Sequence, residues 1–109
     1  MSYISLLGAI IFEVLGTMLL PISKNFTKPL ISIVIVTAYM VSFYLLTFAL
    51  KEIPIAIAYS TWAGGGIFLI TLLGYFLYGQ SLQWQSLLGL LFIAIGVAIV
   101  NTFKNNEIL

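Results

Sequence analysis

Cysteine, histidine, aspartate and arginine are all absent from this 109-residue sequence, and only 6% of its residues are charged. Without cysteine no disulfide can form, and without cysteine or histidine the usual ligands of structural metal sites are missing. A net charge of +1 argues against a nucleic-acid partner, because such proteins need many basic residues to neutralise phosphates. We therefore expect no metal, no cofactor and no nucleic acid.

Hydrophobic residues dominate instead, at 62% of the chain. The mean hydropathy of +1.21 excludes an ordinary water-soluble domain. Charges and helix breakers divide the sequence into four apolar segments, each close to the ~20 residues that span a bilayer. The sequence predicts one all-α domain over residues 1–109, with transmembrane helices at about 3–20, 30–50, 55–78 and 86–102. Pro21 is expected to end or kink the first of them, because proline lacks the N–H that a helix needs.

The lysines give no clear orientation in the membrane. Lys51 and Lys104 fall on the side of the N-terminus, and Lys24 and Lys28 fall on the other side. Two against two gives the positive-inside rule nothing to act on. Insertion in both orientations, or dual topology, is therefore predicted, unless the order of synthesis or a partner fixes the orientation.

Glu13 is the most informative residue, because it lies near the middle of the first apolar segment. A charge at the centre of a bilayer costs at least about 2.5–3.5 kcal/mol, so such residues usually face a protein interior or a wet cavity. No basic residue in the apolar segments can neutralise it. The alternative is a tolerated polar residue in a packed interface, but a binding site for a proton or a cation is the better interpretation.

A bundle of four helices packs around its own side chains and leaves little central cavity, so a path for a solute favours an oligomer. Gly89 and Gly96 lie two helical turns apart, on one stripe of the fourth helix. Small residues at this spacing let helices approach closely in lipid. They predict a contact either with a second copy or within the same chain.

The third helix contains three consecutive glycines, Gly64, Gly65 and Gly66. Each costs about 1 kcal/mol relative to alanine, so a close helix crossing or a working bend must offset the penalty. Tyr59 and Trp62 share a face one turn earlier, and Tyr39 and Ser42 have the same spacing on the second helix. Aromatic faces near a carboxylate suit a bulky organic cation, although packing explains the same spacing.

These residues together resemble the small multidrug resistance family. The resemblance covers nearly the whole chain and rests on a mid-helix glutamate, Glu13, a Tyr-x-x-Trp-x-Gly pattern in the third helix, and the glycines of the fourth. It implies a proton-coupled antiporter that exports organic cations and works as an antiparallel homodimer in the cytoplasmic (inner) membrane of a prokaryote. The implied site, on both subunits, contains the following residues: Glu13, Gly16, Thr17, Tyr39, Ser42, Tyr59 and Trp62. The resemblance also implies a bend of the third helix at Gly64–Gly66 and a dimer contact at Gly89 and Gly96.

The family has a branch that exports hydrophobic quaternary cations and another that exports guanidinium. The guanidinium branch typically has tryptophan where this chain has Gly16, so Gly16-Thr17 resembles the multidrug branch. Three departures concern the substrate range: Pro21 replaces a common lysine, Ala63 replaces serine or threonine, and Ser60-Thr61 replaces a more apolar pair. Export of guanidinium or a polyamine, a paralogous partner chain, and a pore without coupled transport are the alternatives. An enzyme is not expected, because Glu13 is the only candidate base in the apolar segments.

Overall fold

The computed structural model describes residues 2–103, and the predicted tail from Lys104 onwards lies outside them. It contains four helices and, within this range, no strand: α1 (Ser2–Ser23), α2 (Pro29–Ala49), α3 (Ile55–Tyr78) and α4 (Trp84–Thr102). All four are long and apolar enough to cross a membrane. At 1.5 Å per residue they are roughly 28–36 Å long, which matches a hydrocarbon core of ~30 Å. The predicted all-α membrane fold is confirmed.

The end of α1 differs from the prediction. The helix continues through Pro21 and ends at Ser23, whose Oγ donates to the carbonyl of Leu20 at 2.7 Å. The chain then reverses through three residues with positive φ, at 49°, 62° and 64° over residues 24–26. Proline at this point removes only one hydrogen bond of the final turns. The left-handed turn, rather than the proline, therefore stops the helix.

The end of α3 follows a familiar glycine rule. Gly79 adopts φ +66° and its N–H bonds to the carbonyl of Gly74. This left-handed conformation is easy only for a residue without Cβ, so glycine closes the helix here. Residues 80–83 then lead into α4.

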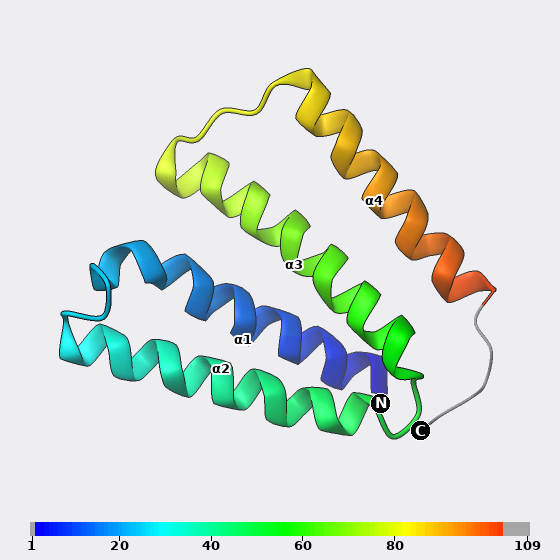
Figure 1. Ribbon diagram of the computed structural model, residues 1–109, viewed down its shortest axis with the longest axis horizontal. Coiled ribbons are helices and arrows are strands. Elements are labelled where there is room, and N and C mark those ends of the chain that lie inside the picture. The colour runs from blue at the N-terminus through cyan, green and yellow to red at the C-terminus, as the bar shows by residue number, and fades with distance from the viewer. Residues whose placement is uncertain (1, 104–109) are drawn as a thin grey trace.

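The helices form a single row, in the order α2, α1, α3, α4, rather than a closed bundle (Figure 1). The molecule is accordingly flat, measuring 43 × 35 × 19 Å. Its core lies where α1 meets the start of α3 and the α2–α3 turn; Leu6, Ile53 and Ala58 are among its buried members. No residue of α4 is buried. The expectation that four helices pack around their own side chains fails, because α4 packs mainly against α3 at the end of the row.

Hydrogen bonds between helices hold this row together. The buried Ser42 hydroxyl on α2 donates to the carbonyl of Ala9 on α1 at 2.6 Å. The Tyr78 hydroxyl at the end of α3 donates to the carbonyl of Met18 on α1. Such bonds matter in lipid, where hydrophobicity alone does not bring helices together.

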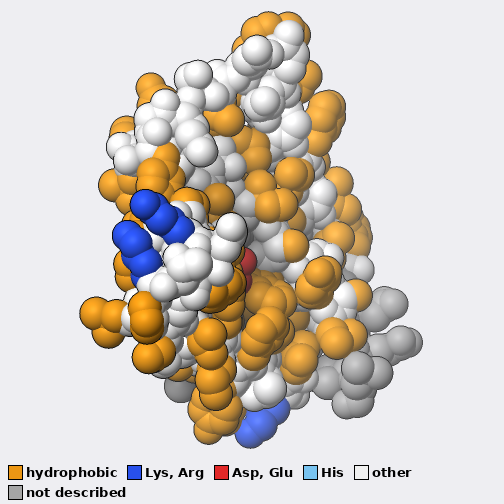
Figure 2. Space-filling view, turned by 60° about the vertical axis from the view of Figure 1, so that its left-hand side comes forward, with side chains coloured by type: hydrophobic (Ala, Val, Ile, Leu, Met, Phe, Trp, Pro, Cys, Tyr) orange, Lys and Arg blue, Asp and Glu red, His pale blue; other side chains and the backbone are white. Residues whose placement is uncertain are grey.

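Hydrophobic side chains are spread over the face shown in Figure 2, with one group of basic side chains at its left edge and another at the bottom. The α1–α2 loop, with Lys24 and Lys28, lies at one end of the molecule, and the α2–α3 loop, with Lys51, lies at the other (Figure 1). Lys24 and Lys28 thus lie on the opposite side from Lys51, as the sequence predicts. The orientation itself stays a prediction, and Lys104, its fourth lysine, is outside the described residues.

Candidate functional site

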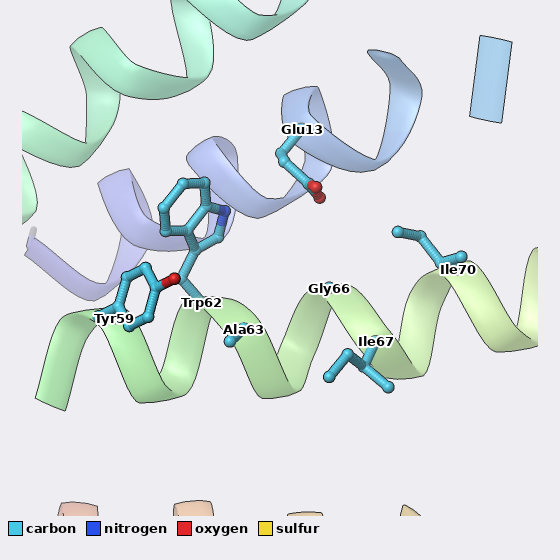
Figure 3. A pocket seen from close by; sticks show the side chains of 7 residues that line it. All are labelled: Glu13, Tyr59, Trp62, Ala63, Gly66, Ile67 and Ile70. Carbon is cyan, nitrogen blue, oxygen red and sulfur yellow. The ribbon is translucent and has the colours of Figure 1, made fainter. Parts of the chain in front are cut away.

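Glu13 lies between α1 and α3 and is partly buried. Its carboxylate points towards α3, at the level of Gly66 (Figure 3). A Cβ added at Gly66 would lie 3.3 Å from Oε2 of Glu13, so the glycine makes room for the carboxylate. Every lysine among residues 2–103 lies in a loop between two helices. The carboxylate therefore has no basic partner within the described helices.

A short chain of hydroxyl groups holds the carboxylate from the side of α2. The Thr17 hydroxyl, one helical turn after Glu13, donates to Oε1 at 3.1 Å. The Thr17 hydroxyl oxygen also hydrogen-bonds to the Tyr39 hydroxyl on α2 at 2.8 Å. Gly16 brings the tyrosine ring close, because a Cβ there would lie only 2.9 Å from Cε1 of Tyr39. Gly16, Thr17 and Tyr39 thus orient Glu13 together.

A pocket of about 230 Å³ opens in front of the carboxylate. Besides Glu13 it is lined by one stripe of α3 (Figure 3): Tyr59, Trp62, Ala63, Gly66, Ile67 and Ile70. The spacing of three and four residues places these side chains on one face of the helix. The pocket combines one carboxylate, two aromatic rings and an otherwise apolar wall.

The aromatic rings are fixed in an edge-on arrangement. The Tyr59 and Trp62 rings lie 5.8 Å apart at 77°, and Phe43 of α2 contacts Trp62 at 5.6 Å and 82°. Edge-to-face pairs of this kind are favourable beyond simple burial. Tyr59 is 62% exposed, so its side of the pocket is open. Phe43 could not be predicted from the sequence, because apolar residues occur on every face of α2 and do not indicate which face meets α3.

The remaining predicted residues lie elsewhere. Ser42 does not line the pocket, because its hydroxyl is bound to the backbone of α1 at 2.6 Å from the Ala9 oxygen. Gly89 and Gly96 are exposed, and a Cβ at either would meet nothing within 4 Å. The described chain therefore does not use these two glycines for a contact of its own, which leaves a second copy as the candidate.

Each glycine of the triplet in α3 faces a different neighbour. A Cβ would lie 2.6 Å from Val97 Cγ2 of α4 at Gly64, and 3.0 Å from Ile10 Cδ1 of α1 at Gly65. At Gly66 it would meet the carboxylate of Glu13. Close crossings therefore account for all three glycines. α3 continues without interruption through them, and a bend at this point stays a prediction.

The chemistry available to the site is limited and specific. Among residues 2–103 no three of the acidic, histidine or cysteine side chains come together to hold a metal. A single partly buried carboxylate can accept a proton or pair with a cation, and it cannot do both fully at once. Aromatic faces beside it favour a cation that is large and weakly hydrated.

Comparison with known proteins identifies the family. The sequence profile of the Small Multidrug Resistance protein family matches residues 1–93. The chain is 43% identical over 104 residues to the multidrug transporter EmrE of Escherichia coli (strain K12), covering 95% of this chain and 94% of that protein. It is 40% identical over 100 residues to the quaternary ammonium compound-resistance protein QacF of Klebsiella aerogenes, covering 92% and 91%. It is 36% identical to the multidrug resistance protein EbrB of Bacillus licheniformis, covering 91% and 83%. The chain belongs to the Small Multidrug Resistance family, and with its four apolar helices it is a multi-pass protein of the inner membrane.

Proposed function

We propose that this protein is a proton-coupled antiporter that exports hydrophobic quaternary cations, and that Glu13 binds protons and substrate in turn. The observation that carries the proposal is the Glu13 carboxylate, which faces an aromatic pocket and has no basic partner in the described helices. The relatives support it, since they are named as multidrug transporters and as quaternary ammonium resistance proteins. The pocket contains one carboxylate and no second catalytic group, which also favours a transporter over an enzyme.

The exchange follows from competition for one group. A cation in the pocket neutralises Glu13 and lies against the faces of Tyr59 and Trp62, whereas a proton neutralises the same carboxylate directly. The Thr17 hydroxyl stabilises the ionised carboxylate by donating to it at 3.1 Å. Competition, combined with alternating access of the pocket to the two sides of the membrane, couples inward proton flow to export.

The working unit is an antiparallel dimer of this chain. The pocket is open beside Tyr59, and α4 has no buried residue, so the single chain leaves both its site and one helix unfinished. The exposed stripe at Gly89 and Gly96 offers a surface for close helix contact. The even distribution of lysines supports insertion of the two copies in opposite orientations. A second Glu13 would then share the protons and the cation.

The packing at Gly16 favours the quaternary-cation branch over the guanidinium branch. Because a single added Cβ would already lie 2.9 Å from the Tyr39 ring, the tryptophan of the guanidinium branch cannot fit here without moving that ring. Moving it would separate Tyr39 from Thr17. A guanidinium or polyamine exporter remains the alternative outcome of the transport test.

Transport into liposomes tests the proposal. The purified chain is reconstituted alone, a pH gradient is imposed, and uptake of tetrapropylammonium is compared with uptake of guanidinium. The variant is Glu13→Gln, and the matched control is Glu52→Gln, which removes an exposed glutamate of the α2–α3 loop. We expect gradient-driven tetrapropylammonium uptake that Glu13→Gln abolishes and Glu52→Gln retains.

Three results would contradict parts of this proposal. Unchanged uptake by Glu13→Gln would remove the carboxylate from the mechanism. Uptake of guanidinium alone would overturn the assignment to the quaternary-cation branch. Uptake that needs a second, different chain would replace the homodimer by a heterodimer.

A further inference from the structure

The fourth helix is attached to the rest of the chain at few points. No residue of α4 is buried, and α3 is the helix it packs against. One attachment is apolar, where Val97 fits over Gly64. The other is polar and lies one turn further along, at Asn101. Because no residue of α4 is buried, few apolar contacts restrain the rotation of this helix.

The Asn101 amide reaches three helices at once. Its Nδ2 donates to Thr61 Oγ1 on α3 at 2.8 Å and to the Val97 carbonyl of its own helix at 2.9 Å. Its Oδ1 accepts from the Tyr3 hydroxyl on α1 at 2.7 Å. Both amide hydrogens and the oxygen are thus engaged. We call Asn101, Thr61 and Tyr3 the Asn101 clamp.

Two neighbouring hydroxyl groups, by contrast, bond only within their own helices. Ser60, next to Thr61, donates only to the Ala56 carbonyl of its own helix at 2.7 Å. Thr102, next to Asn101, donates to the Ala98 carbonyl of its own helix at 2.8 Å. Bonds of this local kind satisfy a hydroxyl without joining helices. Asn101 keeps a local bond of this kind to the Val97 carbonyl, but its amide also bonds to Thr61 on the neighbouring helix.

We propose that Asn101 is the positioning residue of α4, and that through Thr61 and Tyr3 it sets the rotation of this helix against α3 and α1. A single polar side chain in an apolar helix is well suited to fixing register, because slippage by one residue turns the helix by about 100° and leaves the amide without partners in hydrocarbon. Thr61, which departs from the more apolar pair typical of the family, thereby acquires a partner.

The rotation of α4 decides where its exposed glycine stripe points. If the stripe at Gly89 and Gly96 contacts a second copy, the Asn101 clamp also sets the geometry of that contact. This second step rests on the proposed function. The first step, the rotation of α4 within one chain, does not depend on it.

The absence of cysteine from the sequence makes a distance measurement direct. Cysteines introduced at Ile4 of α1 and Ile95 of α4, which are 67% and 46% exposed, take one spin label each. Labelled chains are diluted tenfold with unlabelled ones in liposomes, so that distances within one chain dominate the dipolar signal. The same label pair is measured in Asn101→Leu, Thr61→Val and their combination, with Thr102→Val and Ser60→Ala as matched controls.

We expect one narrow distance distribution in the parent chain and in both controls. Asn101→Leu and Thr61→Val should each shift or broaden it, and the double variant should add nothing to Asn101→Leu, since both act on one bond. Thr61→Ser, which keeps a hydroxyl, should restore the parent distribution. If the Asn101→Leu chain does not insert into the membrane, Thr61→Val alone still tests the proposal.

The inference is overturned if Thr61→Val leaves the distribution unchanged, or if the control variants change it as much. Gradient-driven transport by the parent chain is measured in parallel. Unchanged distances together with normal transport would reject the Asn101 clamp and leave the proposed function standing. Altered distances in a chain that never transports would support the clamp and reject the function.

Discussion

Adding one methyl group at Gly16 tests how the carboxylate is held. In Gly16→Ala the new Cβ would lie 2.9 Å from Cε1 and 3.1 Å from Cδ1 of Tyr39. Ordinary contact begins at 3.4 Å, so the ring must withdraw by about 0.5 Å. A withdrawal along the same direction would lengthen the 2.8 Å bond between Tyr39 and Thr17 to about 3.3 Å. At that length the hydrogen bond lies outside the usual range of about 2.5–3.0 Å and is weakened.

Two effects of different size follow from this shift. Overpacking of a close-packed interface costs about 1–3 kcal/mol, which should appear as a lower free energy of unfolding. Hydrogen bonds between membrane helices average about 0.6 kcal/mol, which corresponds to roughly a threefold change in an equilibrium constant. We therefore expect Gly16→Ala to unfold more easily and to bind tetrapropylammonium about threefold more weakly, because Thr17 and then Glu13 lose their orientation.

A double-mutant cycle separates the hydrogen bond from general damage. Tyr39→Phe removes the hydroxyl without crowding, and it should weaken tetrapropylammonium binding by a similar factor. Added to Gly16→Ala, it should change binding little further. Gly8→Ala is the matched control, because its Cβ would meet only the flexible end of Leu45, at 3.0 Å, in the same α1–α2 interface. Binding losses that simply multiply in the double variant, or an equal loss in Gly8→Ala, would refute the reasoning.

Four further outcomes are expected. In Gly64→Ala the new Cβ would lie 2.6 Å from Val97 Cγ2, so the free energy of unfolding measured by detergent denaturation should fall by about 1–3 kcal/mol. Adding Val97→Ala should restore much of the lost stability. Gly66→Ala should weaken tetrapropylammonium binding about threefold through the carboxylate oxygen at 3.3 Å, with little change in unfolding. Leucine at both Gly89 and Gly96 should lower the dimer fraction measured by energy transfer between labelled chains. The circular dichroism of the helices should stay unchanged, since no atom of residues 2–103 lies within 4 Å of a Cβ added at either position. If one proton leaves for each cation bound, the apparent Kd for tetrapropylammonium in equilibrium dialysis should rise by up to about tenfold for each unit that the pH falls. A Kd that does not change with pH would exclude competition.

The number and approximate extent of the helices could be predicted because the bilayer imposes them. Hydrocarbon thickness fixes the length of a span, and charges fall where the chain leaves the membrane. The end of α1 was harder to predict. Pro21 carries the strongest local signal, yet the helix stops only where three residues, 24–26, adopt positive φ. Nothing in Lys24 or Phe26 announces that conformation, since neither is a residue that favours it.

Part of the site was also predictable, because the bilayer makes polar residues costly. Glu13 stands out because a carboxylate in hydrocarbon is costly, and Tyr59 and Trp62 stand out because aromatic residues share its depth. The structure brings these three side chains to one pocket. The roles of Phe43 and Ser42 were not predictable, because they depend on the rotation of α2, and apolar residues occur on every face of that helix. In water an amphipathic pattern would have supplied that rotation.

The glycines of α3 show what such rotation decides. Three consecutive glycines read as one flexible unit in the sequence, because each adds the same helix penalty of about 1 kcal/mol. In the folded chain they point in three directions, and their neighbours are α4 at Gly64, α1 at Gly65 and the carboxylate at Gly66. Three different contacts offset the three penalties, so flexibility is not needed to explain them. A bend of α3 at these glycines during transport would disturb all three contacts. Movement of α3 would then be coupled to the Glu13 carboxylate, to Ile10 of α1 and to Val97 of α4.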